Sequence, residues 1–204
     1  MLPEFIKTIL MASHRLRDTR EATFASFKPY LAEICSHFKL SNILEFGPGT
    51  STEVFLKHSN ASVISIEESR IWCWKYRFRF RHGPVNVYYK KPGWDLSELD
   101  DLGGPYDLIF VDGGNRTEEL KYCVDLLTPE GIVFLHDAHR ENYADGIRAY
   151  PYVFFPERHS CLMCKNPDVM SRLKTILKPD YSCRCKYCNT KARNIYLSSF
   201  IEDH

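Results

Sequence analysis

The sequence predicts one α/β domain built on a doubly wound, mostly parallel sheet with helices on both faces. Short β-rich apolar runs alternate with helix-like segments, which is typical of a parallel sheet. A glycine-rich turn follows the first run, and four of the first five runs carry an acid at or near their end. The 204 residues are enough for one such domain and a short appendage.

The composition excludes several classes of protein. Hydrophobic residues make up 44% of the chain and the formal net charge is +1, so nothing global predicts a nucleic-acid or acidic partner. Glu4 and Lys7 interrupt the apolar start, which lacks the cleavage site of a signal peptide. No run reaches the roughly 18 apolar residues of a membrane helix. We therefore expect a soluble cytoplasmic protein with no membrane partner.

Three segments are expected along the chain. Residues 1–39 form an N-terminal helical segment, because apolar residues recur there at helical spacing and glycines are absent. Pro29 kinks or restarts this segment. Residues 40–165 form the sheet domain, and residues 166–204 form a cysteine-rich C-terminal extension.

The first strands and helix follow in order. The run NILEF (42–46) predicts the first buried strand, and the glycine-rich loop comes directly after it. A helix is expected from about residue 51 to 59, and Thr50 and Glu53 have the spacing of a capping box that would fix its start. The β-rich run SVISIE (62–67) predicts the second strand.

Residues 69–82 are expected to form a helix, although their alternation of arginine and phenylalanine also permits a strand. Gly83 and Pro84 would end this helix. A helix here is expected to bury Ile71, Trp74 and Phe78 and to leave its arginines in water. For this reason we interpret the basic, aromatic run as a packed helix rather than a nucleic-acid surface.

The remaining elements complete the sheet. VNVYY (85–89) and YDLIFVD (106–112) predict the third and fourth strands. A helix over 117–127 is expected to end at Thr128-Pro129-Glu130-Gly131, and GIVFLHD (131–137) predicts the fifth strand.

Acids mark the ends of four predicted strands. In a doubly wound sheet, ligands bind beyond the carboxyl ends of the strands. Acidic residues are poor strand formers and are costly to bury unpaired. One such acid is explained as a cap for the next helix, but four at equivalent places predict a shared cleft. These acids are Glu45, Glu67, Asp112 and Asp137.

The glycine loop indicates a nucleoside-containing ligand. Gly47 and Gly49 let the backbone approach a ligand closely. Glu67 lies 20 residues after Gly47, the spacing at which an acid accepts hydrogen bonds from ribose hydroxyls. A dinucleotide and S-adenosylmethionine both fit. A dinucleotide loop requires a third glycine where this chain has Thr52, and Glu45 suits a positively charged amino group better than a pyrophosphate.

Four segments resemble motifs of a known family. They resemble motifs of the class I S-adenosylmethionine-dependent methyltransferases and are, in order, ILEFGPGTST, SVISIEES, YDLIFVDGG and LLTPEGIVFLHDA. The last of them resembles a segment of the small-molecule O-methyltransferase branch of that family. The resemblance covers roughly residues 40–165 and implies a Rossmann-like fold. It also implies that the last strands of the fold include the segment VFFPERHSCLMCKN. The cofactor-binding residues that it implies are Glu45, Gly47, Gly49, Thr50, Glu67, Glu68 and Asp112.

The expected reaction is methyl transfer to an oxygen of a small molecule or glycan. A hydroxyl acceptor must lose its proton to a base or to a metal-bound group. In metal-dependent members of the branch, acids at the positions of Asp112 and Asp137 bind a divalent cation, and their oxygens suit magnesium or calcium. Ala138 stands where that branch supplies an amide ligand. His136 and His139 are therefore alternative candidates for a general base.

The C-terminal cysteines suggest a second metal. Of eight cysteines, five fall between residues 161 and 188. Two C-x2-C pairs, Cys161 with Cys164 and Cys185 with Cys188, have a spacing close to that of ribbon-like structural zinc sites. If residues 159–166 instead form a strand, Cys161 and Cys164 point to opposite faces and cannot share an ion without a turn.

Two other functions remain as alternatives. One is an NAD-type oxidoreductase, against which Thr52 and the long helical segment before the first strand both argue. The other is a zinc-bearing binding module on an inactive methyltransferase fold, against which the four strand-end acids argue. The acceptor and the oligomeric state are not readable, because acceptor pockets are built from variable loops.

Overall fold

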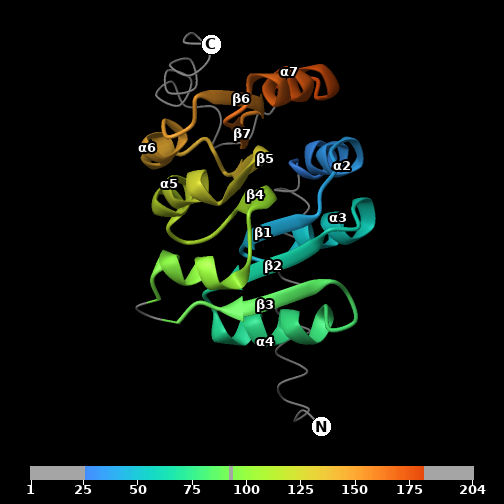
Figure 1. The fold of residues 1–204 in the computed structure, drawn as a ribbon, viewed down its shortest axis with the longest axis vertical. Helices are drawn as coiled ribbons and strands as arrows, with labels where there is room; N and C mark the ends of the chain where they lie inside the picture. Colours follow the sequence, from blue (N-terminus) through green and yellow to red (C-terminus); the bar gives the residue numbers. More distant parts are fainter. Residues whose placement is uncertain (1–25, 92–93, 182–204) are drawn as a thin grey trace.

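The protein is a sheet enclosed between two layers of helices (Figure 1). The structure is a computed structural model, and it describes residues 26–91 and 94–181. The described residues form a seven-stranded sheet with strand order β3-β2-β1-β4-β5-β7-β6. β7 runs antiparallel to both of its neighbours, β5 and β6, whereas β1 to β5 pair in parallel.

The strands are β1 (Asn42–Phe46), β2 (Ser62–Glu67), β3 (Val85–Tyr89), β4 (Tyr106–Val111), β5 (Leu127–His136), β6 (Tyr152–Glu157) and β7 (Ser160–Cys164). The α-helices are α2 (Lys28–His37), α3 (Thr50–His58), α4 (Arg70–Arg79), α5 (Arg116–Leu126), α6 (Ala144–Ile147) and α7 (Pro167–Ile176). Two short 3-10 helices, η1 (Leu96–Leu102) and η2 (Glu141–Tyr143), complete the described elements.

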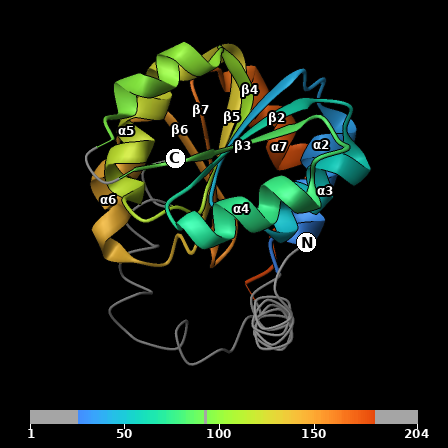
Figure 2. The ribbon, with the colours of Figure 1, turned by 90° about the horizontal axis from the view of Figure 1, so that it is seen from below.

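Each face of the sheet has its own apolar core. Figure 2 shows α5 and α6 on one face and α2, α3, α4 and α7 on the other. Along β4, Leu108 and Phe110 belong to the core under α2, α3, α4 and α7. Ile109 and Val111 belong to the core under α5 and α6. Because both faces are covered, β4 is apolar along most of its length rather than alternating. The predicted fold class and the five predicted strands are therefore confirmed.

The helix predictions are confirmed in position with small changes at their ends. Pro29 lies in the first turn of α2, so it starts this helix rather than kinking it. Within the predicted N-terminal segment, residues 1–25 lie outside the described residues. The predicted stop after α5 was wrong in detail, because β5 already begins at Leu127. Residues 128–131 fit into β5 because the pairing of β4 with β5 shifts register between Tyr106 and Leu108.

The prediction for the buried face of α4 was wrong. Ile71, Trp74 and Phe78 are 69%, 43% and 57% exposed, whereas Cys73 and Tyr76 are buried. Both sets of residues have helical spacing, so periodicity alone could not choose between the two stripes. Because these three side chains are exposed, the packing of α4 gives no ground for excluding a nucleic-acid surface there.

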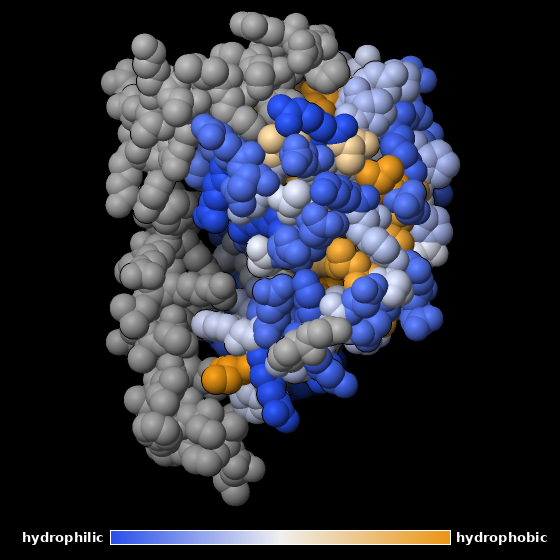
Figure 3. Space-filling model, turned by 90° about the vertical axis from the view of Figure 1, so that its left-hand side faces the viewer, coloured by the Kyte–Doolittle hydropathy of each residue, from blue (hydrophilic) through white to orange (hydrophobic). Residues whose placement is uncertain are grey.

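The first part of the predicted C-terminal extension belongs to the sheet domain. In α7, Val169, Met170 and Leu173 are buried and join the same core as α2 and α3. Residues 182–204 lie outside the described residues. No helix within 26–91 or 94–181 combines the length and apolarity that spanning a bilayer requires. The face seen in Figure 3 is largely hydrophilic, with scattered apolar residues outside the grey atoms.

The packing of α7 gives a stability prediction. Leu173 is fully buried, so Leu173→Ala should lower the free energy of unfolding by about 2–5 kcal/mol through lost contacts and a residual cavity. Urea denaturation measures this, with Lys174→Ala, an exposed neighbour on α7, as the matched control. Equal stability of the two variants would show that α7 does not pack as described.

Candidate functional site

The glycine loop after β1 is attached to the strands on both sides. The Gly47 N–H donates to the Ile66 carbonyl at 2.9 Å, and the Asp112 N–H donates to the Phe46 carbonyl at 3.0 Å. Gly47 has φ +86°, and a Cβ added there would lie 3.0 Å from the Asp112 carbonyl oxygen. Any other residue would be strained at this position. The loop therefore lies directly against the end of β4.

Glu45, on β1, fixes the segments on both sides of this loop through side-chain hydrogen bonds. Its carboxylate is fully buried and accepts hydrogen bonds from Ser51 Oγ at 2.5 Å, Thr52 Oγ1 at 2.7 Å and Ser65 Oγ at 2.6 Å. The Thr52 hydroxyl also accepts a hydrogen bond from the Gly49 N–H at 3.0 Å. The three hydroxyls belong to α3 and β2. Glu45 thus connects β1, β2 and the first turn of α3.

The electrostatics of Glu45 reflect this enclosure. Burial raises the pKa of its carboxyl, whereas the three hydroxyl hydrogen bonds lower it. Burial is the larger effect, and the resulting pKa is about 7. The nearby charge of Asp112 raises it further. The sequence predicted that Glu45 contacts a ligand. In this arrangement its oxygens instead accept hydrogen bonds from hydroxyls of α3 and β2.

The start of α3 differs from the prediction in how it is capped. The helix begins at Thr50, as predicted within one residue, but its N-cap is Gly49. Glu53 pairs with Arg79 instead of forming a capping box with Thr50. Among the described residues, only the Tyr76 hydroxyl would lie near an added Cβ on Gly49, at 3.9 Å. The space over Gly49 is therefore open, next to the N–H groups of the first helical turn.

The acids after β2 lie beside the loop after β4. Glu67 is partly buried and accepts a hydrogen bond from the Ser69 N–H at 2.7 Å. Glu68 pairs with Lys90 at 3.0 Å, and its carboxylate occupies the place where Gly114 lacks a side chain. The structure thus brings these predicted residues to the same edge of the sheet as Gly47 and Asp112.

Glu119 is a buried acid that sequence reasoning missed. It lies on α5, is 1% exposed, and its Oε2 has no hydrogen-bond partner among the described residues. A Cβ added to Gly113 would come within 2.6 Å of this oxygen. Burial raises the pKa of Glu119, while Lys90, whose Nζ lies 3.4 Å away, lowers it. No motif marks this residue, because its burial depends on the loop that folds back over α5.

Asp112 and Asp137 are joined by a buried arginine. They follow β4 and β5, and Arg116 lies 2.5 Å from Asp112 Oδ1 and 3.6 Å from Asp137 Oδ2. Arg116 is only 7% exposed and also donates to the carbonyls of Gly113 and His136. Asp112 is the more accessible acid, with a side chain 33% exposed.

His136 lies between the two carboxylates. Its Nδ1 is 3.2 Å from Asp112 Oδ1, and its Nε2 is 3.9 Å from Asp137 Oδ1. Burial lowers the pKa of His136, but the hydrogen bond and charge of Asp112 together with the charge of Asp137 outweigh it, so the pKa is raised. For Asp137, burial raises the pKa, but the positive groups around it, His136 and Arg116 first, hold it below its usual value.

His139 lies on the other side of Asp137 and contacts a second histidine. Its Nδ1 is 2.9 Å from the Nδ1 of His159, a residue that the sequence reasoning did not select. His159 belongs to the turn between β6 and β7, and only the antiparallel pairing of β7 with β5 places it beside the end of β5. The order of residues along the chain gives no sign of this contact.

The structure does not bring Cys161 and Cys164 together. Both are buried in β7, and they belong to the cores on opposite faces of the sheet. Burial raises the pKa of both thiols, which disfavours the thiolate that binds zinc. They therefore do not converge on one ion. Cys185 and Cys188 lie outside the described residues.

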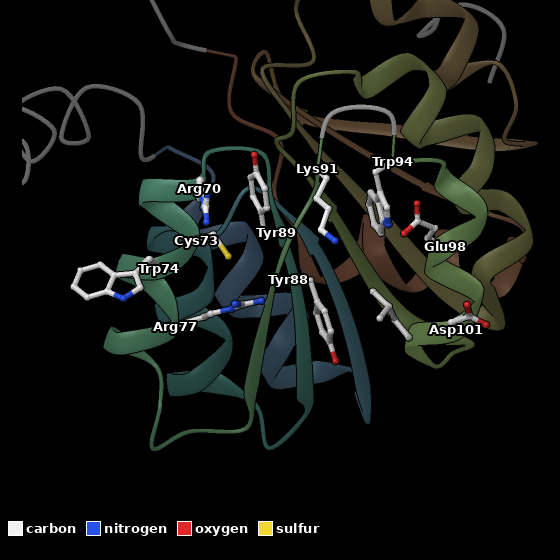
Figure 4. A pocket seen from close by; sticks show the side chains of 11 residues that line it. Arg70, Cys73, Trp74, Arg77, Tyr88, Tyr89, Lys91, Trp94, Glu98 and Asp101 are labelled. Atoms are coloured by element: carbon white, nitrogen blue, oxygen red, sulfur yellow. The ribbon is translucent and has the colours of Figure 1, made fainter.

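A separate cavity of about 680 Å³ lies beside the free edge of β3. Figure 4 shows its lining by Arg70, Trp74 and Arg77 from α4, Tyr88 from β3, and Trp94. No residue predicted for cofactor or catalysis lines it. The cavity is therefore distinct from the cluster of strand-end acids.

Solved structures with a similar fold include methyltransferases. The O-methyltransferase from Bacillus cereus, in complex with SAH, is 17% identical, with a TM-score of 0.56 over 80% of this chain and 90% of that one. A methyltransferase-like protein from Silicibacter pomeroyi is 18% identical, with a TM-score of 0.55 over 74% and 94%. A methyltransferase from Geobacter sulfurreducens is 16% identical, with a TM-score of 0.52 over 80% and 90%.

No family model matches the sequence, and no curated protein matches it. At these identities the structural likeness establishes the fold alone. The chain has the Rossmann-like α/β fold of the class I S-adenosylmethionine-dependent methyltransferases.

Glu45 generates a pH prediction. Its folded pKa of about 7 exceeds the ordinary value of 4.5, so between these values the unfolded chain is ionised while the folded chain keeps the proton. Stability contributed by this raised pKa is present in acid and lost as the pH rises. Relative to Glu45→Gln, the wild type should gain about 2 kcal/mol when the pH falls from about 7.5 to about 5.

Urea denaturation of both proteins at the two pH values measures this difference. Glu130→Gln, which changes an exposed acid, is the control. A wild-type-to-variant difference that is the same at both pH values would contradict the buried, proton-holding state of Glu45.

Proposed function

We propose that this protein transfers a methyl group from S-adenosylmethionine to an oxygen atom of a small molecule or glycan. The observation that carries the proposal is the convergence of the loop at Gly49, Glu67 and Asp112 on one edge of the sheet. Such an edge is where open α/β sheets bind their ligands. The shared fold with the methyltransferases supports the same reaction.

The residues present fit S-adenosylmethionine. The open space over Gly49 is a cradle for the methionine part, with Thr50 and the first-turn N–H groups beside it. The carboxylate of Glu67 would accept hydrogen bonds from the ribose hydroxyls, with Glu68 beside it. Glu119 Oε2, which has no hydrogen-bond partner within the described part of the chain, would accept from an amino group of the cofactor.

Glu45 and Asp112 divide the role that the sequence assigned to Glu45. The buried carboxylate of Glu45 keeps the loop in place through its three hydroxyl partners. Asp112 is partly exposed next to Gly47, so its carboxylate is the better partner for the positively charged amino group. Glu45 thus acts through the loop rather than by direct contact.

The chain's own residues supply proton removal and orientation. When bound, S-adenosylmethionine supplies an electrophilic methyl group on a sulfonium. The acceptor hydroxyl would lose its proton to the Asp112–His136 pair as its oxygen takes the methyl group. Arg116 keeps both carboxylates fixed, so the pair needs no reorganisation. Alignment of the acceptor supplies much of the rate.

A magnesium ion between Asp112 and Asp137 does not fit this arrangement. The guanidinium of Arg116 occupies the space between the two carboxylates and pairs with both. Ala138 supplies no side-chain oxygen. We therefore assign no step of the reaction to magnesium at this place.

The NAD-type alternative is less well supported. A dinucleotide-binding sheet of the usual kind has strand order 3-2-1-4-5-6 with its strands parallel, whereas here antiparallel β7 lies between β5 and β6. Thr52, at the place of the third glycine, is engaged with Glu45. The inactive zinc-bearing alternative loses one of its two cysteine pairs, because the thiols of Cys161 and Cys164 do not converge on one ion.

Cofactor binding gives the most direct test. S-adenosylhomocysteine should bind with a Kd in the micromolar range. Glu67→Gln should weaken binding about tenfold or more, because charged hydrogen bonds to the ribose are lost. Isothermal titration calorimetry measures both, and Glu118→Gln, an exposed acid on α5, is the control. Binding of NAD without binding of S-adenosylhomocysteine would overturn the proposal.

Catalysis by the Asp112–His136 pair predicts a pH profile. The base must be deprotonated, and the pKa of His136 is raised above 6.5. Methyl transfer should therefore increase with pH through a limb that lies above pH 6.5. The assay follows labelled methyl transfer to a panel of phenols and hydroxylated sugars. In His136→Asn the rise of activity with pH should disappear, and kcat should fall about 10²- to 10⁴-fold. Full activity in this variant would exclude His136 as the base.

A further inference from the structure

Two buried histidines and a carboxylate meet beyond the end of β5. His139 and His159 are 5% and 6% exposed, and their Nδ1 atoms lie 2.9 Å apart. Their rings stand edge to face, with centroids 4.7 Å apart at 82°. Asp137 contributes a carboxylate oxygen, and the three potential ligand atoms all lie within 4.8 Å of one another.

The main chain sets this arrangement. The Ala138 N–H donates to the His159 carbonyl at 3.0 Å, which fixes the two histidine-bearing turns against each other. His136 pairs with Ser160 in the antiparallel ladder just before them. Asp137 has φ +59°, a left-handed conformation that turns the chain sharply after β5. The side chains are therefore brought together before any ligand binds.

We propose that Asp137, His139 and His159 form a binding site for a transition-metal ion such as zinc or cobalt. Nitrogens bound at about 2.1 Å to one ion lie about 3.0 Å apart at a right angle and about 3.4 Å apart in a tetrahedron. The 2.9 Å between the two Nδ1 atoms matches the first value and requires only a small shift for the second. Among the described residues, these three protein ligands leave at least one coordination position for water or substrate.

The charges around the site favour a transition metal over magnesium. Arg140 lies 2.6 Å from Asp137 Oδ2 and Arg116 lies 3.6 Å from the same oxygen. His136 faces the other oxygen at 3.9 Å. The carboxylate is thus largely neutralised, which disfavours a hard cation that depends on negative oxygen ligands. Two neutral imidazoles suit zinc, cobalt or nickel, whose affinity comes from nitrogen donors.

The place of the site suggests what the ion would do. It shares Asp137 with the cluster of Asp112, Arg116 and His136, at the same edge of the sheet. A hydroxyl group coordinated there would have a lowered pKa and would lose its proton more readily. This role rests on the proposed methyl transfer, but the existence of the metal site does not.

The test is metal binding by untagged full-length protein, freed of metal by dialysis against a chelator. With cobalt chloride, the visible absorption of a nitrogen-ligated cobalt ion should appear and saturate at one ion per chain. The Kd for zinc sulfate should lie below about 10 μM. His139→Ala and His159→Ala should each weaken the binding of cobalt and of zinc at least about tenfold. His37→Ala, which changes an exposed residue on α2, should leave both affinities unchanged.

A thermal scan guards against variants that do not fold. Zinc should raise the Tm of the wild type and of His37→Ala, but not that of His159→Ala or Asp137→Asn, because only an intact site stabilises the folded state. Folded wild type that shows neither the cobalt spectrum nor a zinc-dependent Tm shift would overturn the proposal, and the histidines would then be a hydrogen-bonded pair. Unchanged binding in His159→Ala would overturn it as well.

These titrations contain no S-adenosylmethionine. Failure to bind metal would therefore leave the proposed methyl transfer standing, and failure to bind S-adenosylhomocysteine would leave the metal site standing.

Discussion

The candidate site depends on one buried carboxylate. Glu45 accepts hydrogen bonds from hydroxyls on β2 and on the first turn of α3, and so connects the segments around the glycine loop. Burying an acid is costly unless hydrogen bonds compensate, and these three partners provide the compensation. With the loop fixed, Gly47 lies against the Asp112 carbonyl, and an added Cβ on Gly49 would meet only the Tyr76 hydroxyl among the described residues.

A buried guanidinium organises the other half of the site. The guanidinium of Arg116 lies between the carboxylates that follow β4 and β5, and it also donates to the His136 carbonyl. Removing one partner of such a network would leave an uncompensated buried charge. The antiparallel strand β7 then adds His159 to this edge, which places imidazoles beside a carboxylate that two arginines already neutralise.

Much of this could be predicted from sequence, for reasons that are local. Apolar runs followed by acids mark strands and their carboxyl ends, and parallel strands bring those ends to one edge. What failed depends on contacts across the fold. Both apolar stripes of α4 have helical spacing, so only packing decides that Trp74 is exposed and Tyr76 is buried. The hydroxyl partners of Glu45 and the contact of His139 with His159 join distant segments and leave no local signal.

The central claim is that S-adenosylmethionine binds across the loop held by Glu45 and the loops after β2 and β4. Hydrogen–deuterium exchange with and without S-adenosylhomocysteine tests this most directly, since it reports backbone protection at each segment. The account predicts that protection on ligand addition concentrates in residues 46–52, 67–69 and 112–116, with no change around the cavity beside β3. Protection confined to α4 and the segment around Trp94, with none at the glycine loop, would contradict it.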